Sequence, residues 1–211
     1  MGLQKLALNF MVERSGKLAK SLFCIKSVKL TNLNKLKYVP LQSNIEKVIS
    51  SNTNNKGIKL WNMVIRKGKN EAILKNCHIE QSEIPFEYCD CVPFDYIKKG
   101  KLNALSIGVL KSSGGGLGAE SIKEAVKLSH RLGQEGRLVL VAFQIDAKKG
   151  NPIPFYYKMG FKSLKPKEQL EIEKGMIDFY KNGKYSGPEI SAMYLPMEKI
   201  NCILSEISLL A

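Results

Sequence analysis

Four glycines fall within five residues halfway along the chain, between an apolar segment and a helical pattern. Residues 113–119 read SGGGLGA, and residues 102–110 before them have the length and apolar character of a strand. Residues 117–132 have the spacing of an amphipathic helix. Glycine lets the backbone adopt positive φ and approach a ligand closely. We therefore expect a strand, a tight turn and a helix in succession at this point.

The remaining segments place this unit within a larger sheet. Residues 58–66 and 71–79 alternate as the two strands of a hairpin, and 137–144 is a strong buried strand. The order of elements predicts an α/β fold with a mixed, largely antiparallel central sheet flanked by helices, rather than a doubly wound sheet. Further strands are expected at 23–30, 161–164 and 191–197, helices at 1–22, near 45–49 and at 152–159, a loop at 50–57 and a charged insertion at 165–188.

The chain is strongly basic, with a formal charge of +14 over 211 residues. Residues 1–56 alone hold ten Lys or Arg and two Glu. An excess of Lys and Arg over Asp and Glu attracts polyanions, of which CoA, nucleic acid and anionic lipid are examples. No apolar run approaches the length of a membrane span. We expect a basic N-terminal segment at 1–55, packed on its own domain, a main domain at 56–200 and a C-terminal tail at 201–211.

Cysteine usage indicates a reducing compartment, and we expect the cytoplasm. The five cysteines are odd in number and irregular in spacing, which gives no disulfide framework. The C-x2-C spacing that lets two thiolates hold one tetrahedral ion is absent, although Cys77 and His78 are followed by Cys89 and Cys91. We therefore predict no metal site.

The glycine turn is typical of an anion site. The first turn of a helix leaves N–H groups unpaired and carries positive dipole charge, which suits a pyrophosphate. A P-loop is excluded because no Lys-Ser/Thr pair follows the glycines. The dinucleotide fingerprint G-x-G-x-x-[GA] is matched by Gly114, Gly116 and Ala119, with Asp146 at the end of the next strand. That fingerprint belongs on the first strand of its fold, however, and here it begins halfway along the chain.

Two signatures resemble those of the GNAT superfamily of acyl-CoA-dependent N-acyltransferases. The family carries [RQ]-x-x-G-x-[GA] between a strand and a helix, and residues 113–118 fit this pattern except that Ser113 replaces Arg or Gln. A second signature like F-Y-x-K-x-G-F is matched in full at residues 155–161 (FYYKMGF). The two lie about 40 residues apart in the family's order, with the strand 137–144 between them. The resemblance covers roughly residues 58–197.

The resemblance implies acetyl-CoA as cosubstrate and direct transfer of its acyl group to a primary amine. Tyr156 would act as the general acid on the departing thiolate, while Tyr157 packs. The strand at 102–110 would splay from 137–144 to admit the pantetheine arm. The residues implied in cofactor binding are Val109, Leu110, Lys111, Ser113, Gly114, Gly115, Gly116, Leu117, Gly118, Ala119 and Asn151.

Parts of the family pattern are not matched by this sequence. Ser113 lacks the long donor side chain, for which Lys111 or the additional glycine N–H groups would compensate. The strand at 102–110 carries no carboxylate to serve as general base. Glu83 or Glu87 is the preferred substitute, and neither is assigned. We expect residues 23–57 and 80–100 to recognise the acceptor.

Two further classes of function stay open. The basic N-terminal part could bind RNA, the ribosome or an anionic surface, with the CoA fold degenerate. Its lysines lack the interleaved aromatic residues on which bases stack, which counts against this alternative. An oxidoreductase that binds a nicotinamide dinucleotide is the other alternative, because of the fingerprint at residues 114–119.

Overall fold

The computed structural model describes residues 45–81, 92–144 and 150–208. The helix expected at 1–22 and the strand expected at 23–30 lie outside the described residues. So do Glu83, Glu87 and Asp146.

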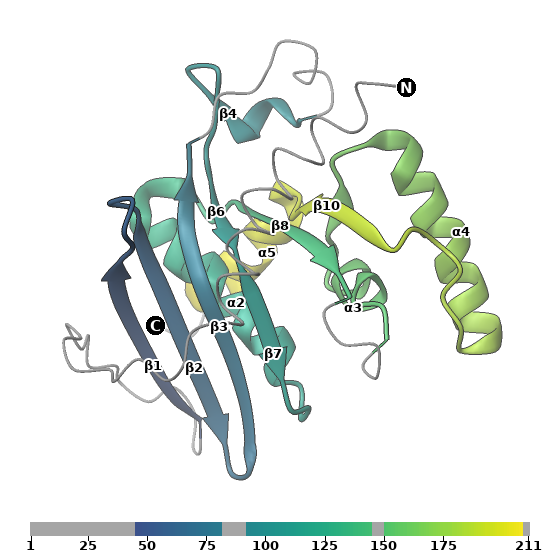
Figure 1. The fold of residues 1–211 in the computed structure, drawn as a ribbon, viewed down its shortest axis with the longest axis horizontal. Coiled ribbons are helices and arrows are strands. Elements are labelled where there is room, and N and C mark those ends of the chain that lie inside the picture. Colours follow the sequence, from purple (N-terminus) through teal and green to yellow (C-terminus); the bar gives the residue numbers. More distant parts are fainter. Residues whose placement is uncertain (1–44, 82–91, 145–149, 209–211) are drawn as a thin grey trace.

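An eight-stranded sheet forms the centre of the described residues (Figure 1). Its strand order is β1-β2-β3-β6-β8-β10-β9, with β7 paired to β3 outside this path. Each described pairing is antiparallel except that of β6 with β8. The predicted α/β class with a largely antiparallel sheet is therefore confirmed. The strands are β1 (Glu46–Thr53), β2 (Lys59–Lys67), β3 (Asn70–Glu80), β6 (Ala104–Ile107), β7 (Val109–Ser112), β8 (Leu138–Phe143), β9 (Lys162–Ser163) and β10 (Ile190–Tyr194).

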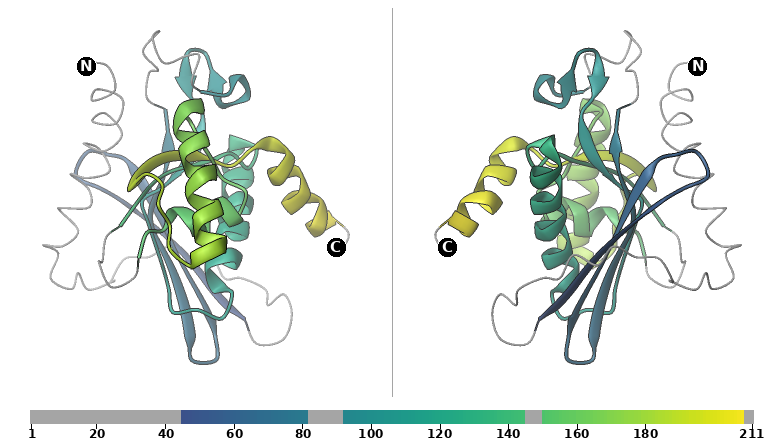
Figure 2. Two further views of the ribbon diagram at one scale, coloured as in Figure 1. Left: turned by 90° about the vertical axis from the view of Figure 1, so that its right-hand side faces the viewer. Right: turned by 90° about the vertical axis from the view of Figure 1, so that its left-hand side faces the viewer.

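Helices cover the sheet unevenly. In Figure 2, α2 lies on one face of the sheet and α5 lies beyond it on the same side, while α4 stands at the edge formed by β9 and β10. No helix in the described ranges is both long enough and apolar enough to cross a membrane. The helices are α2 (Leu117–Ser129), followed by a π-helical turn at His130–Gln134, α3 (Ile153–Lys158), α4 (Pro166–Asn182) and α5 (Met197–Ser208); a short 3-10 helix at Phe94–Tyr96 precedes the hairpin of β4 (Ile97–Lys98) and β5 (Lys101–Leu102).

The core lies mainly between the sheet and α2. The predicted apolar stripe of α2 is buried there, since Ile122, Ala125 and Val126 are fully covered. A smaller cluster on Tyr96 fills a second core. The Tyr96 hydroxyl donates to the carbonyl of Leu195 at 2.5 Å and accepts from the N–H of Leu138 at 3.2 Å, which ties the 3-10 helix to the sheet.

The strand predicted at 102–110 is divided in two at Gly108. β6 pairs with both β3 and β8, whereas β7 continues along β3 alone. A β-carbon on Gly108 would stand 3.0 Å from Asn76 Cβ and from the carbonyl oxygens of Lys75 and Asn76. Asn76 itself has a φ of 56°. This close approach of the two backbones requires glycine and redirects the strand away from β8.

The sequence predictions for residues 45–57 are wrong, and two later segments differ in detail from what was expected. Residues near 45–49 were expected to be helical and 50–57 to form a loop, but β1 pairs with β2 over eight residues, from Glu46 to Thr53. The insertion at 165–188 contains the 17-residue helix α4. The last strand ends at Tyr194 rather than at 197, and most of the expected tail belongs to α5.

Candidate functional site

The glycine turn leads directly into α2. Gly114, Gly115 and Gly116 all have positive φ, between 64° and 109°, and Gly116 is the left-handed N-cap of the helix. The N–H groups of Leu117 and Ala119 donate to the carbonyls of Gly114 and Gly116. Among the described residues, no acceptor is recorded for the N–H groups of Gly115, Gly116 and Gly118. Two of these residues, Gly116 and Gly118, line the cleft described below, so their main-chain donors at the positive end of a 13-residue helix can meet an anion.

Ser113 anchors this turn to β3. Its N–H donates to the carbonyl oxygen of Glu71 at 2.9 Å, and its hydroxyl accepts from the N–H of Glu71 at 2.8 Å. Both groups are therefore engaged with the hairpin. The glycines that follow Ser113 are held at the end of β7 as a result.

One edge of β7 is left open by the break at Gly108. Because Ser113 pairs with Glu71 through its N–H, the alternation of an antiparallel ladder also directs the N–H groups of Lys111 and Val109 toward β3. The N–H of Leu110 then points to the opposite edge, where β8 has diverged. Of these three residues, Leu110 lines the cleft described next.

A cleft of about 360 Å³ lies between the glycine turn and α3. Its size is at the lower end of ligand sites in proteins. Two residues of the glycine turn do not line this cleft. Leu117 turns its side chain into the core. Gly115 lies against the Asn70 side chain, whose Nδ2 would be 2.6 Å from a β-carbon added to Gly115. The cleft is lined by Leu110, Ser112, Gly114, Gly116, Gly118, Ala119, Pro152, Phe155 and Tyr156.

Tyr156 forms the inner wall of this cleft. It is 8% exposed, and its ring lies edge-on to Phe155 at 5.1 Å and to Phe161 at 5.6 Å between centroids. No hydrogen bond of its hydroxyl is recorded within the described ranges. Burial raises the pKa of Tyr156 well above its ordinary value, and the nearby Cys77 adds to the rise. The phenol is therefore held in its protonated form at neutral pH, and Tyr156 is one of the residues that line the cleft.

Asn151 lies apart from the glycine turn. Its side-chain oxygen Oδ1 accepts from the N–H of Ile153 at 2.8 Å, at the start of α3. Its amide nitrogen donates to the carbonyl of Pro188 at 3.1 Å. Asn151 lines a second hollow on the far side of Phe155. The sequence missed the role of Phe155 as the wall between the two hollows, although this residue opens the second signature.

The described candidates for a general base lie on β3 and on the 3-10 helix. His78 Nε2 is 3.4 Å from Glu80 Oε2, and the His78 ring also lies 3.2 Å from the carbonyl of Asn76. Asp95 lies on the 3-10 helix and is exposed. Within the described ranges, no group of three or more His, Cys, Asp or Glu residues is arranged to hold a metal ion.

Comparison of the chain with protein-family models, with curated proteins and with solved structures gives no significant match. The assignment of a function therefore rests on the chemistry of the cleft. The cleft combines main-chain donors for an anion, an open strand edge and a protonated phenol. Such an arrangement can bind an extended anionic ligand and protonate a leaving group.

Proposed function

We propose that this protein is an acyl-CoA-dependent N-acyltransferase that transfers an acetyl group from acetyl-CoA to a primary amine by direct attack. One observation carries the proposal: Gly116 and Gly118, whose N–H groups have no acceptor among the described residues, line the same cleft as the buried phenol of Tyr156. A diphosphate at the turn and a thioester near the phenol are joined in CoA by an extended arm. The divergence of β7 from β8 supports a place for that arm.

Each group has a defined part in the proposed reaction. The N–H groups of Gly116 and Gly118 bind the diphosphate. The outward N–H of Leu110 donates to the thioester carbonyl as negative charge develops on its oxygen. The amine nitrogen forms a bond to the carbonyl carbon, and the carbon–sulfur bond breaks. Tyr156 donates its proton to the departing thiolate, and the proton lost by the amine passes to water or to a base.

Ligand-dependent thermal unfolding tests the proposal against its alternatives. Acetyl-CoA is expected to raise the melting temperature of the full chain, with little change between low and moderate salt, because ligand binding stabilises the folded state. A shift caused equally by heparin and abolished by salt would favour a polyanion-binding module. A shift with NAD and none with acetyl-CoA would favour the dinucleotide alternative. Release of CoA thiol in the presence of an amine panel then tests turnover.

A further inference from the structure

Helix α4 stands at the sheet edge formed by β9 and β10 and is anchored along one face only (Figure 2). That face is buried at Ile172, Gly175 and Met176. Near the start of the helix, Glu168 accepts a hydrogen bond at 2.6 Å from the hydroxyl of Ser191 in β10. The opposite face of this 17-residue helix is exposed along its length.

Large apolar side chains stand on this exposed face. Leu170 is 59% exposed and Ile177 is 52% exposed, and they lie about two turns apart along one line of the helix. Tyr180, which is 65% exposed, follows one turn later. Single exposed apolar residues are ordinary on a protein surface. Apolar side chains aligned on the outer face of one helix are instead typical of a surface that packs against another helix.

A row of alternating charges runs beside these apolar residues. Its members follow one another at spacings of four, three, four and three residues, which places them on one stripe of the helix. No ion pair of the first three members is recorded within the described ranges. The row consists of Lys167, Glu171, Lys174, Asp178 and Lys181.

We infer that the outer face of α4 binds a second copy of this chain, with the two α4 helices antiparallel about a twofold axis. In such a pair the same side of each helix meets the same side of the other, so the charged row pairs with itself. When the axis passes just after residue 172, Lys174 of each copy lies opposite Glu171 of the other. Lys167 likewise lies opposite Asp178. Every charge in these four pairs meets its opposite.

The apolar residues fit the same register. Leu170 of each copy lies within one turn of Ile177 of the other, on both sides of the axis. A parallel twofold pair would instead set identical charges at the same height along the two helices. Exposed ion pairs contribute little to affinity on their own. Burial of the apolar residues therefore stabilises the dimer, and the charged row determines its orientation.

The charged row also distinguishes a second copy from other occupants of this face. Residues 1–22 of the chain are apolar and basic, with four Lys or Arg and one Glu. A basic segment would meet three lysines and two carboxylates on α4, and an acidic partner would meet the two carboxylates. A second copy carries the same alternation in the opposite direction, and it pairs four of the five charges.

Sedimentation equilibrium of the full chain at low salt, from about 1 μM to about 1 mM, tests this inference. We expect a reversible equilibrium between monomer and dimer. Glu171→Lys and Lys174→Glu each turn two attractive pairs into repulsive ones, and each should raise the Kd of the dimer by about five- to tenfold. The double variant should return the Kd toward that of the wild type. An equimolar mixture of the two single variants should also associate more tightly than either alone.

Substitutions of the remaining residues on this face test the apolar contact and the position of the axis. Ile177→Asp should raise the Kd by about tenfold or more, because the contact is lost on both sides of the axis. Phe94→Asp is the matched control, since Phe94 is 90% exposed but lies on the 3-10 helix, and it should keep the wild-type Kd. Glu173 lies on the other flank of α4 beside the axis, where it faces its own counterpart. Glu173→Gln should therefore lower the Kd.

The outcomes that would overturn this dimer are distinct. A mass of one chain up to about 1 mM, where even a millimolar Kd gives substantial dimer, is the result expected if residues 1–22 cover the face instead. A dimer whose Kd is unchanged in Ile177→Asp would mean that the copies meet elsewhere. Failure of the double charge variant to recover would contradict the antiparallel register. Wild-type melting temperatures of the variants show that the fold is intact.

Discussion

The ring of Phe155 lies directly over Gly118: a β-carbon on this glycine would stand 3.1 Å from Phe155 Cζ. Gly118 is in the first turn of α2 and does not have a positive φ. Glycine is therefore required here by the limited space beside the Phe155 ring and not by backbone strain. Leucine is a much better helix former than glycine. The change Gly118→Leu should therefore keep α2 folded while its side chain fills the mouth of the cleft.

We expect Gly118→Leu to abolish measurable binding of acetyl-CoA by calorimetry, and Gly118→Ala to weaken it by about tenfold (about 1.4 kcal/mol), because the added β-carbon meets Phe155 Cζ and narrows the cleft. The melting temperature without ligand serves as the control for folding. Wild-type affinity in Gly118→Leu would remove the cleft from the site of cofactor binding.

Tyr156→Phe is predicted to separate binding from turnover. The ring keeps its contacts with Phe155 and Phe161, whereas the proton donor is lost. General acid catalysis contributes about 100-fold or more, and we expect a loss of that size in the rate of CoA release at unchanged affinity for acetyl-CoA. Tyr157→Phe is the matched control, because Tyr157 does not line the cleft and should keep its rate. Full activity of Tyr156→Phe would exclude Tyr156 as the acid.

The local sequence predicted the centre of the fold well. The hairpin of β2 and β3 and the helices α2 and α3 fall where their periodicity indicates, because glycine at the turns and apolar spacing agree with the tertiary packing. Glycine at 114–116 also predicted the positive φ values of the turn. Five of the nine residues that line the cleft lie in the two predicted signatures: Gly114, Gly116, Gly118, Phe155 and Tyr156.

Elements that depend on distant partners were missed. The local spacing of Val48 and Ile49 suggested a helix, but pairing with β2 decides the conformation of β1. The helix α4 was not predicted within the charged insertion at 165–188. Glycine is present at position 175 of this helix because the segment at Gly187 crosses α4 at this point. The separation of β7 from β8 depends on the contact of Gly108 with Asn76, which no local pattern reveals.

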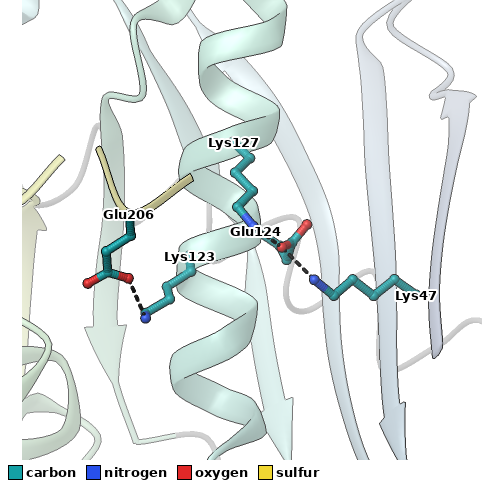
Figure 3. A network of polar contacts seen from close by, with 5 residues as sticks. All are labelled: Lys47, Lys123, Glu124, Lys127 and Glu206. Carbon is teal, nitrogen blue, oxygen red and sulfur yellow. Dashed lines mark hydrogen bonds and ion pairs between the residues drawn. The ribbon is translucent and has the colours of Figure 1, made fainter. Parts of the chain in front are cut away.

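A buried ion pair joins α2 to the edge strand β1 (Figure 3). Glu124 Oε1 lies 2.6 Å from Lys47 Nζ and 2.7 Å from Lys127 Nζ, and the Glu124 side chain is 1% exposed. Removing one partner of a buried pair leaves the other charge uncompensated, which costs about 3 kcal/mol. We expect Glu124→Gln to lower the free energy of unfolding by about this amount, measured by urea denaturation.

The exposed pair of Lys123 and Glu206, which joins α2 to α5, is the control for this change. Exposed ion pairs contribute little to stability. Glu206→Gln should therefore leave the urea midpoint unchanged. An equally small effect of Glu124→Gln would show that the pair between α2 and β1 is not important for stability.

The same carboxylate should make stability depend on pH. Burial alone would raise the pKa of Glu124, but hydrogen bonds from Lys127 and Lys47 outweigh burial and hold that pKa below its ordinary value. A carboxyl whose pKa is lower in the folded than in the unfolded chain stabilises the fold above the unfolded pKa, and this contribution is lost as the pH falls through the folded pKa. We therefore expect the free energy of unfolding to fall from neutral pH toward pH values below about 4. The fall should be smaller in Glu124→Gln, which has no proton to take up at this position. Urea denaturation of both proteins across this range measures the difference, and parallel curves would contradict the assignment of the pH dependence to Glu124.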